Sequence, residues 1–125
     1  MMEFQKSSRW LRIIGLLLLG AWSGMAWGHA FPDHAEPQVG ARVNSSPNLV
    51  RIWFDGAVEP AFSKIRVQDE NGQQVDKGDG HIDSSDATLL EVSLPSLPPG
   101  TYRVIWSVVA RDGHRTQGDY TFTIK

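Results

Sequence analysis

The sequence contains no cysteine, which excludes disulfide bonds and thiolate metal ligands. Its three methionines, Met1, Met2 and Met25, all lie in the first 28 residues, so the rest of the chain has no thioether ligand either. A long hydrophobic run is also missing. The charge-free apolar stretch 13–27 is shorter than the roughly 20 residues that a membrane-spanning helix needs. A metal bound by residues 29–125 would therefore meet only nitrogen and oxygen donors.

Residues 1–28 have the pattern of a secretory signal peptide. Lys6, Arg9 and Arg12 form a basic start, and the apolar stretch 13–27 follows. Small residues stand near the end of that stretch, where a signal peptidase cuts. We expect residues 1–28 to be removed on export, and an uncleaved membrane anchor is the alternative.

Two cleavage positions fit the small residues. Ala26 and Gly28 predict a cut after Gly28, which would leave His29 as the new N-terminus. Gly28 and Ala30 predict a second cut that would leave Phe31 first. The difference matters because only the first cut gives His29 a free α-amino group.

Residues 29–125 form one domain with a modest negative charge. The first 28 residues hold three of the 12 Lys and Arg residues and one of the 14 Asp and Glu residues. The remaining 9 basic and 13 acidic residues give a net charge of −4 with histidine neutral. Nucleic-acid phosphates would be repelled, so we expect no nucleic-acid partner. The charge attracts cations weakly.

Short alternating segments separated by turn residues predict an all-β fold. The expected strands are 49–54, 62–69, 88–94, 101–110 and 119–124, with an irregular first strand within 29–48. Asn71-Gly72 is typical of a hairpin turn, and 76–87 is expected to be a solvated loop. About seven strands in under 100 residues indicate a two-layer antiparallel sandwich or barrel. Aromatic residues at strand spacing are expected in its core, namely Trp53, Phe54, Phe62, Tyr102, Trp106, Tyr120 and Phe122.

The tripeptide Asp-Gly-His occurs twice. The first copy ends at His81 within the polar stretch 76–87, where we expect a solvated residue and not a ligand. The second copy, Asp112 to His114, directly follows an apolar strand. If that strand continues, both side chains point the same way, because faces alternate with period two. A tight turn with a spectator histidine is the alternative.

A free N-terminal His29 would supply two nitrogens to one metal, its amine and its imidazole. His114 would add a third nitrogen and Asp112 an oxygen. Three nitrogens and one carboxylate suit Cu(II), and less often Ni(II). Because the amine must lose its proton, binding is expected to weaken in acid.

The chain resembles the CopC family of periplasmic copper-binding proteins. The resemblance rests on the potential N-terminal His29, "AEP" at 35–37, "VRIWFDGAVEPAFSKIRV" at 50–67 and "LPPGTYRVIWSVVARDGHRTQGDYTFTI" at 97–124. It implies a small Greek-key β-barrel related to immunoglobulin-like sandwiches. It also implies a periplasmic carrier, not an enzyme, that binds one Cu(II) through His29, Asp112 and His114. A CopD-type membrane transporter is the implied partner, and we expect a monomer without a small-molecule substrate.

The sequence departs from the family pattern at a few positions. Some members add a Cu(I) site rich in methionine, and residues 29–125 contain none. Where members often carry a glutamate after the second strand, this chain has Asp55 and Gly56, with Glu59 further on. A carboxylate role for Asp55 or Glu59 beside the metal stays open, as does a metal contact by His34.

Two other functions remain at this point. A histidine chelate plus a second histidine also resembles the copper site of lytic polysaccharide monooxygenases, although a carboxylate ligand would close the position that oxygen needs. An immunoglobulin-like binding module without a metal is the other alternative. The sequence does not separate copper uptake, delivery and storage.

Overall fold

The computed structural model describes residues 29–125, and the expected signal peptide lies outside the described residues. The elements within this range are β1 Pro32–Glu36, β2 Arg42–Val43, β3 Leu49–Phe54, the 3-10 helix η1 Pro60–Phe62, β4 Lys64–Gln68, β5 His81–Ile82, β6 Leu89–Ser93, β7 Gly100–Val109 and β8 Arg115–Ile124. None of the helical segments between residues 29 and 125 has the length and apolar character to cross a membrane.

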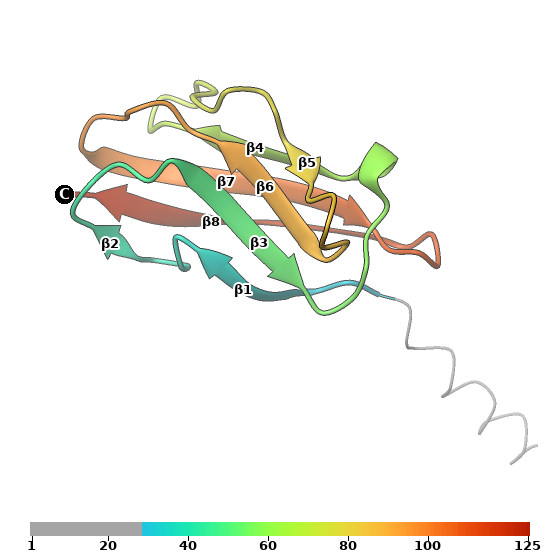
Figure 1. Ribbon diagram of the computed structural model, residues 1–125. Helices are drawn as coiled ribbons and strands as arrows, with labels where there is room; N and C mark the ends of the chain where they lie inside the picture. Colours follow the sequence, from blue (N-terminus) through green and yellow to red (C-terminus); the bar gives the residue numbers. More distant parts are fainter. Residues whose placement is uncertain (1–28) are drawn as a thin grey trace, which may run out of the picture.

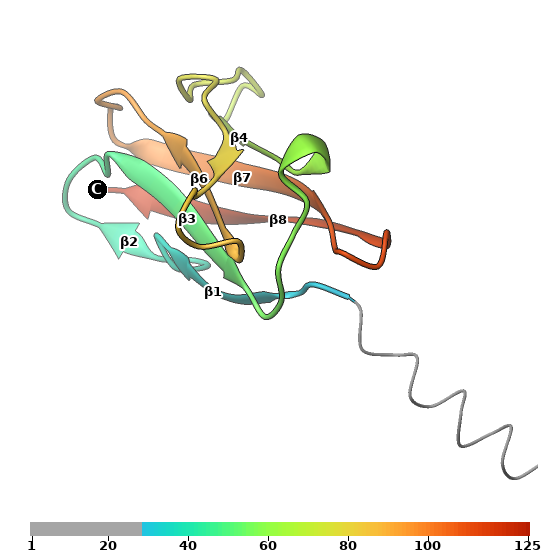
Figure 2. The same ribbon diagram turned by 45° about the vertical axis from the view of Figure 1, so that its right-hand side comes forward.

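Two four-stranded sheets pack face to face (Figures 1 and 2). One sheet has the order β1-β3-β6-β5 and the other β2-β8-β7-β4. All neighbouring pairs are antiparallel except β2 and β8, which run parallel. The predicted all-β, immunoglobulin-like sandwich is confirmed, and the two sheets do not close into a barrel. The described residues form eight strands, whereas about seven were expected. The short strands β2 and β5 have two residues each, which is too few to give a sequence pattern.

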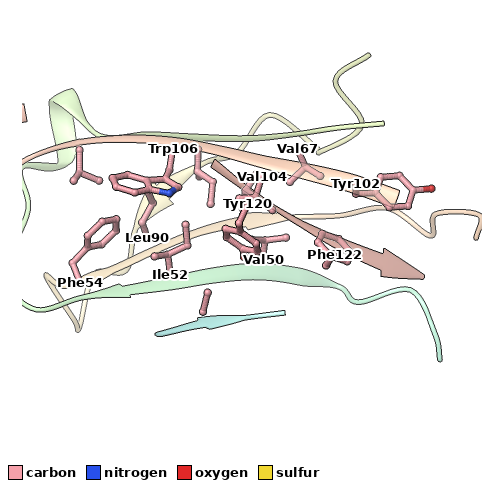
Figure 3. Packing of buried hydrophobic residues seen from close by; sticks show 14 of the residues in the cluster. Val50, Ile52, Phe54, Val67, Leu90, Tyr102, Val104, Trp106, Tyr120 and Phe122 are labelled. Carbon is pink, nitrogen blue, oxygen red and sulfur yellow. The ribbon is translucent and has the colours of Figure 1, made fainter. Parts of the chain in front are cut away.

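The core follows the predicted alternation. In β3, Val50, Ile52 and Phe54 point inward and meet the inward residues of β7 and β8, as Figure 3 shows. The rings of Phe54 and Trp106 pack edge to face, with centroids 5.3 Å apart. All residues of this core cluster lie between Ala30 and Ile124.

Two of the aromatic residues expected in the core lie outside it. Trp53 alternates with Ile52 and Phe54, so its ring faces outward. Phe62 is 59% exposed, because the strand predicted over 62–69 begins only at Lys64. Proline at the start of η1 favours the helical turn that takes Phe62 out of the sheet.

β7 and β8 form a long hairpin. Ten pairs connect them, from Gly100 with Ile124 to Val109 with Arg115. β8 begins at Arg115, four residues before the expected strand 119–124. In these first residues the exposed, polar Arg115 and Gln117 alternate with less exposed neighbours, as in a strand. Gly118 is required within this hairpin, because a Cβ there would lie 2.8 Å from the Trp106 ring. The hairpin positions the second Asp-Gly-His at its turn.

Candidate metal centre

The second Asp-Gly-His forms the turn between β7 and β8 and does not continue the strand. The N–H of Ala110 donates to the carbonyl of His114 (2.9 Å), and the N–H of Gly113 donates to the carbonyl of Ala110 (2.9 Å). Gly113 has a φ of 89°, a conformation that favours glycine and reverses the chain. Of the two alternatives left open by the sequence, the tight turn is therefore the one observed.

Asp112 and His114 nevertheless converge. Asp112 Oδ1 accepts the backbone N–H of His114 at 3.0 Å, and its Oδ2 lies 2.7 Å from His114 Nδ1. The hydrogen bond to the His114 side chain, followed by that to its backbone, lowers the pKa of Asp112. Asp112 is therefore a carboxylate at neutral pH, and one residue both closes the turn and orients the imidazole.

The segment after His29 is hydrogen-bonded to β8 and to Asp55, the residue that follows β3. The Thr116 hydroxyl in β8 donates to the Ala30 carbonyl at 2.7 Å. The N–H of Phe31 donates to Asp55 Oδ1 at 2.8 Å, and the N–H of Asp55 donates back to the Phe31 carbonyl at 2.8 Å. Ala30 itself is buried in the core. These contacts fix where His29 lies.

The hydrogen bonds of Ala30 and Phe31 bring His29 beside the turn of the β7–β8 hairpin, at one end of the sandwich (Figure 1). The rings of His29 and His114 have centroids 4.5 Å apart and an interplanar angle of 80°. One potential ligand atom from each of His29, Asp112 and His114 lies within 4.8 Å of the other two. All three side chains are exposed. Among residues 29–125 they form the one cluster with the spacing of a metal site.

An open hollow of about 490 Å³ adjoins the cluster. Its lining includes His29 and Asp112 together with Asp55, Gly56 and Arg111. A hydrated ion or a small part of another molecule can therefore approach the cluster from solvent.

The other residues considered from the sequence lie differently. His34 stacks on Trp53, with ring centroids 4.4 Å apart and an interplanar angle of 9°, and its Nδ1 lies 2.9 Å from Asp33 Oδ2. Among the described residues it is not part of the metal-type cluster. Glu59 acts through its backbone, accepting the Ser63 hydroxyl at 2.8 Å. Asp55 has a positioning role through Phe31, which the sequence did not indicate.

The stretch 76–87 is a loop as expected, except that His81–Ile82 form the two-residue strand β5, in which His81 is exposed. His81 begins β5, and its Nε2 lies 3.0 Å from Glu91 Oε1 on the neighbouring strand β6. Its Nδ1 lies 2.7 Å from the Asp79 carbonyl oxygen. The hydrogen bond to that carbonyl, with the negative charge of Glu91 nearby, raises the pKa of His81. The structure does not bring His81 to the cluster of His29.

Known proteins resemble this chain over most of its length. The CopC domain family matches residues 33–125. Protein YobA of Escherichia coli (strain K12) is 36% identical over 100 residues, which cover 79% of this chain and 81% of that protein. The copper transport protein CutJ of Bacillus subtilis (strain 168) is 33% identical over 120 residues, covering 95% of this chain but 22% of that protein.

A solved structure has the same fold as this chain. The crystal structure of CopC from Methylosinus trichosporium OB3b superposes with a TM-score of 0.72 at 36% identity, covering 78% of this chain and 94% of that one. The resemblance seen in the sequence is confirmed: the chain belongs to the CopC family.

Proposed function

We propose that residues 29–125, after removal of 1–28, form a periplasmic protein that binds one Cu(II). The amine and imidazole of His29, the imidazole of His114 and the carboxylate of Asp112 would hold the ion. One observation carries the proposal: side chains 83 residues apart in sequence converge, with ligand atoms within 4.8 Å of one another.

The donor set favours the oxidised ion. Nitrogen and carboxylate ligands in a tetragonal arrangement suit Cu(II), whereas Cu(I) is selected by the sulfur ligands that residues 29–125 lack. Acidity should weaken binding, because the amine must be deprotonated to act as a ligand.

Asp112 can contribute in two ways. Its Oδ2 lies on the Nδ1 side of His114, an arrangement that favours the tautomer with the proton on Nδ1 and the lone pair on Nε2. A carboxylate behind a histidine ligand orients the ring and raises its basicity. Asp112 also has an ionised oxygen that can reach the ion itself.

The site fits a carrier better than an enzyme. The cluster is exposed and adjoins an open hollow, so an ion can enter and leave without a large rearrangement. Copper is then the cargo, and the domain sequesters it or hands it to a partner such as a CopD-type membrane transporter. A monomer is sufficient, because one chain supplies all proposed ligands.

Titration of the protein beginning at His29 with Cu(II), followed by electron paramagnetic resonance, tests the proposal. One tetragonal signal with nitrogen coupling, saturating at one equivalent, is the expected result. Tight binding of two equivalents, or a Cu(I) complex that survives a competing chelator, would contradict it. Rapid oxygen consumption with ascorbate would favour a copper monooxygenase-like enzyme over a carrier.

A further inference from the structure

One face of the sandwich carries most of its positive charge. In the sheet β2-β8-β7-β4, inward residues such as Ile65, Val104 and Tyr120 alternate with outward ones. Cross-strand register places the outward residues in rows, for example Lys64 beside Ser107 and Ser107 beside Gln117. We call the cationic residues among them the basic face: Arg42, Lys64, Arg66, Arg103 and Arg115.

The basic face opposes the overall charge of the domain. It holds five of the nine Lys and Arg residues of 29–125, but Asp119 is the one carboxylate in the outward rows of these strands. Asp119 pairs with Arg103. The Arg115 guanidinium donates to the Ser107 hydroxyl, a neutral partner, so its charge is not compensated there. The charge of the domain is therefore unevenly distributed: the net charge is negative, but the outward face of this sheet is positive.

Two neighbouring carboxylates lie at the rim of the sheet, where they bind backbone N–H groups and keep their negative charge. Asp76 Oδ2 accepts the N–H of Val67 at the edge strand β4, and Glu70 Oε1 accepts the N–H of Thr101 at the start of β7. A shallow hollow of about 730 Å³ over the same sheet has Lys64, Arg66 and Ser107 in its lining. The charged residues in the lining of this hollow are two cations, Lys64 and Arg66, and one carboxylate, Asp119.

The composition of this surface favours a lipid over a protein partner. Protein interfaces are enriched in aromatic and methionine anchors. The aromatic residues of β7 and β8 are all buried in the core, and the uncharged outward positions are mainly Ser, Thr and Gln. Clustered cations without aromatic anchors match the electrostatic adsorption of a protein on anionic headgroups.

We propose that the basic face docks residues 29–125 on an anionic phospholipid membrane. The β7–β8 hairpin then lies along the membrane, since both strands belong to the docking sheet, and its turn with Asp112 and His114 lies at one end of the contact. The proposal concerns the surface alone and does not depend on copper.

Sedimentation of the metal-free protein 29–125 with vesicles tests the proposal, and this range contains the core cluster of the fold. The vesicles are phosphatidylcholine alone or mixed with phosphatidylglycerol, at low ionic strength. Binding should require phosphatidylglycerol and should fall with added salt, because salt screens exposed charges. Each cation near an anionic membrane raises the membrane–water partition coefficient of the protein about fivefold. Lys64→Gln should thus weaken binding about fivefold, and Lys64→Gln with Arg66→Gln about 25-fold.

Lys77→Gln is the matched control, because Lys77 is exposed but does not belong to the basic face. Its N–H donates to the carbonyl of Ser93, which lies in the opposite sheet. It should leave binding unchanged, and circular dichroism should show the same fold for every variant. Equal binding to phosphatidylcholine alone, an equal loss from Lys77→Gln, or no binding at all would overturn the proposal. Capture by polyglutamate without binding to phosphatidylglycerol would also overturn it, in favour of an acidic protein partner.

Discussion

The Thr116 hydroxyl donates a hydrogen bond to the Ala30 carbonyl across 86 residues of sequence. This contact joins β8, the second strand of the β7–β8 hairpin, to the residue that follows His29. Asp55 holds the next residue, Phe31, by two hydrogen bonds: its side-chain Oδ1 accepts the Phe31 N–H, and its own N–H donates to the Phe31 carbonyl. The separation of His29 from His114 therefore depends on residues that would not themselves bind the metal.

Thr116→Val should weaken Cu(II) binding while the fold is retained. Valine keeps the shape of threonine but removes the bond to Ala30, so His29 must be ordered by the ion itself. A typical hydrogen bond contributes about 0.5–1.5 kcal/mol, which corresponds to a loss of affinity of up to about tenfold. Competition titration against a Cu(II) chelator measures it. Thr121→Val, on the same strand, is the control and should have the wild-type affinity.

The two Asp-Gly-His copies should differ sharply on substitution. His114→Ala removes a proposed ligand and should lower Cu(II) affinity by orders of magnitude, whereas His81→Ala should leave it nearly unchanged. Asp112→Ala should be damaging too, since both the carboxylate and the contact with His114 Nδ1 are lost. Competition titration of the three variants checks this. Equal losses from His81→Ala and His114→Ala would disprove the assignment.

The local sequence pattern predicted the sandwich well, but it did not predict the residues that position His29 beside the turn. Alternation identified Val50, Ile52 and Phe54 as inward residues, because period two follows from strand geometry. The two-residue strand at His81 was missed, since so short a segment has no period. The roles of Asp55 and Thr116 depend on partners 24 and 86 residues away, and no local pattern encodes such distances.

The proposed metal residues were reached by another route. Asp112 and His114 stood out through their spacing and the family resemblance, while the sequence left open whether they continue the strand or form a turn. Gly113 decides this point, because its positive φ turns the chain where alternation alone would extend it.

His81 should make stability depend on pH. The Asp79 carbonyl, with Glu91 nearby, raises the pKa of His81 above its ordinary value of 6.5, so the folded state favours the protonated ring. Its stabilising contribution is therefore fully present below pH 6.5 and is lost as the pH rises through the folded-state pKa. His81→Gln should lower the free energy of unfolding by about 0.2–1 kcal/mol in acid, the range for an exposed ion pair.

Urea unfolding of wild type and His81→Gln on both sides of the transition measures this effect. The variant and the wild type should be nearly equal in alkaline buffer. A difference in unfolding free energy that grows as the pH rises would contradict a raised pKa of His81 in the folded state.

The last prediction concerns the nitrogen of His29. When another residue precedes His29, this nitrogen is an amide and a poor donor at neutral pH; after cleavage behind Gly28 it is an amine. A protein that begins at His29 with its α-amine acetylated should therefore bind Cu(II) far more weakly than the protein with the free amine, and its paramagnetic resonance should show fewer coupled nitrogens. Thermal unfolding without metal should be the same for both, because the core cluster begins at Ala30. Equal affinity and identical spectra would show that the amine is not a ligand, even if His29 binds through its ring.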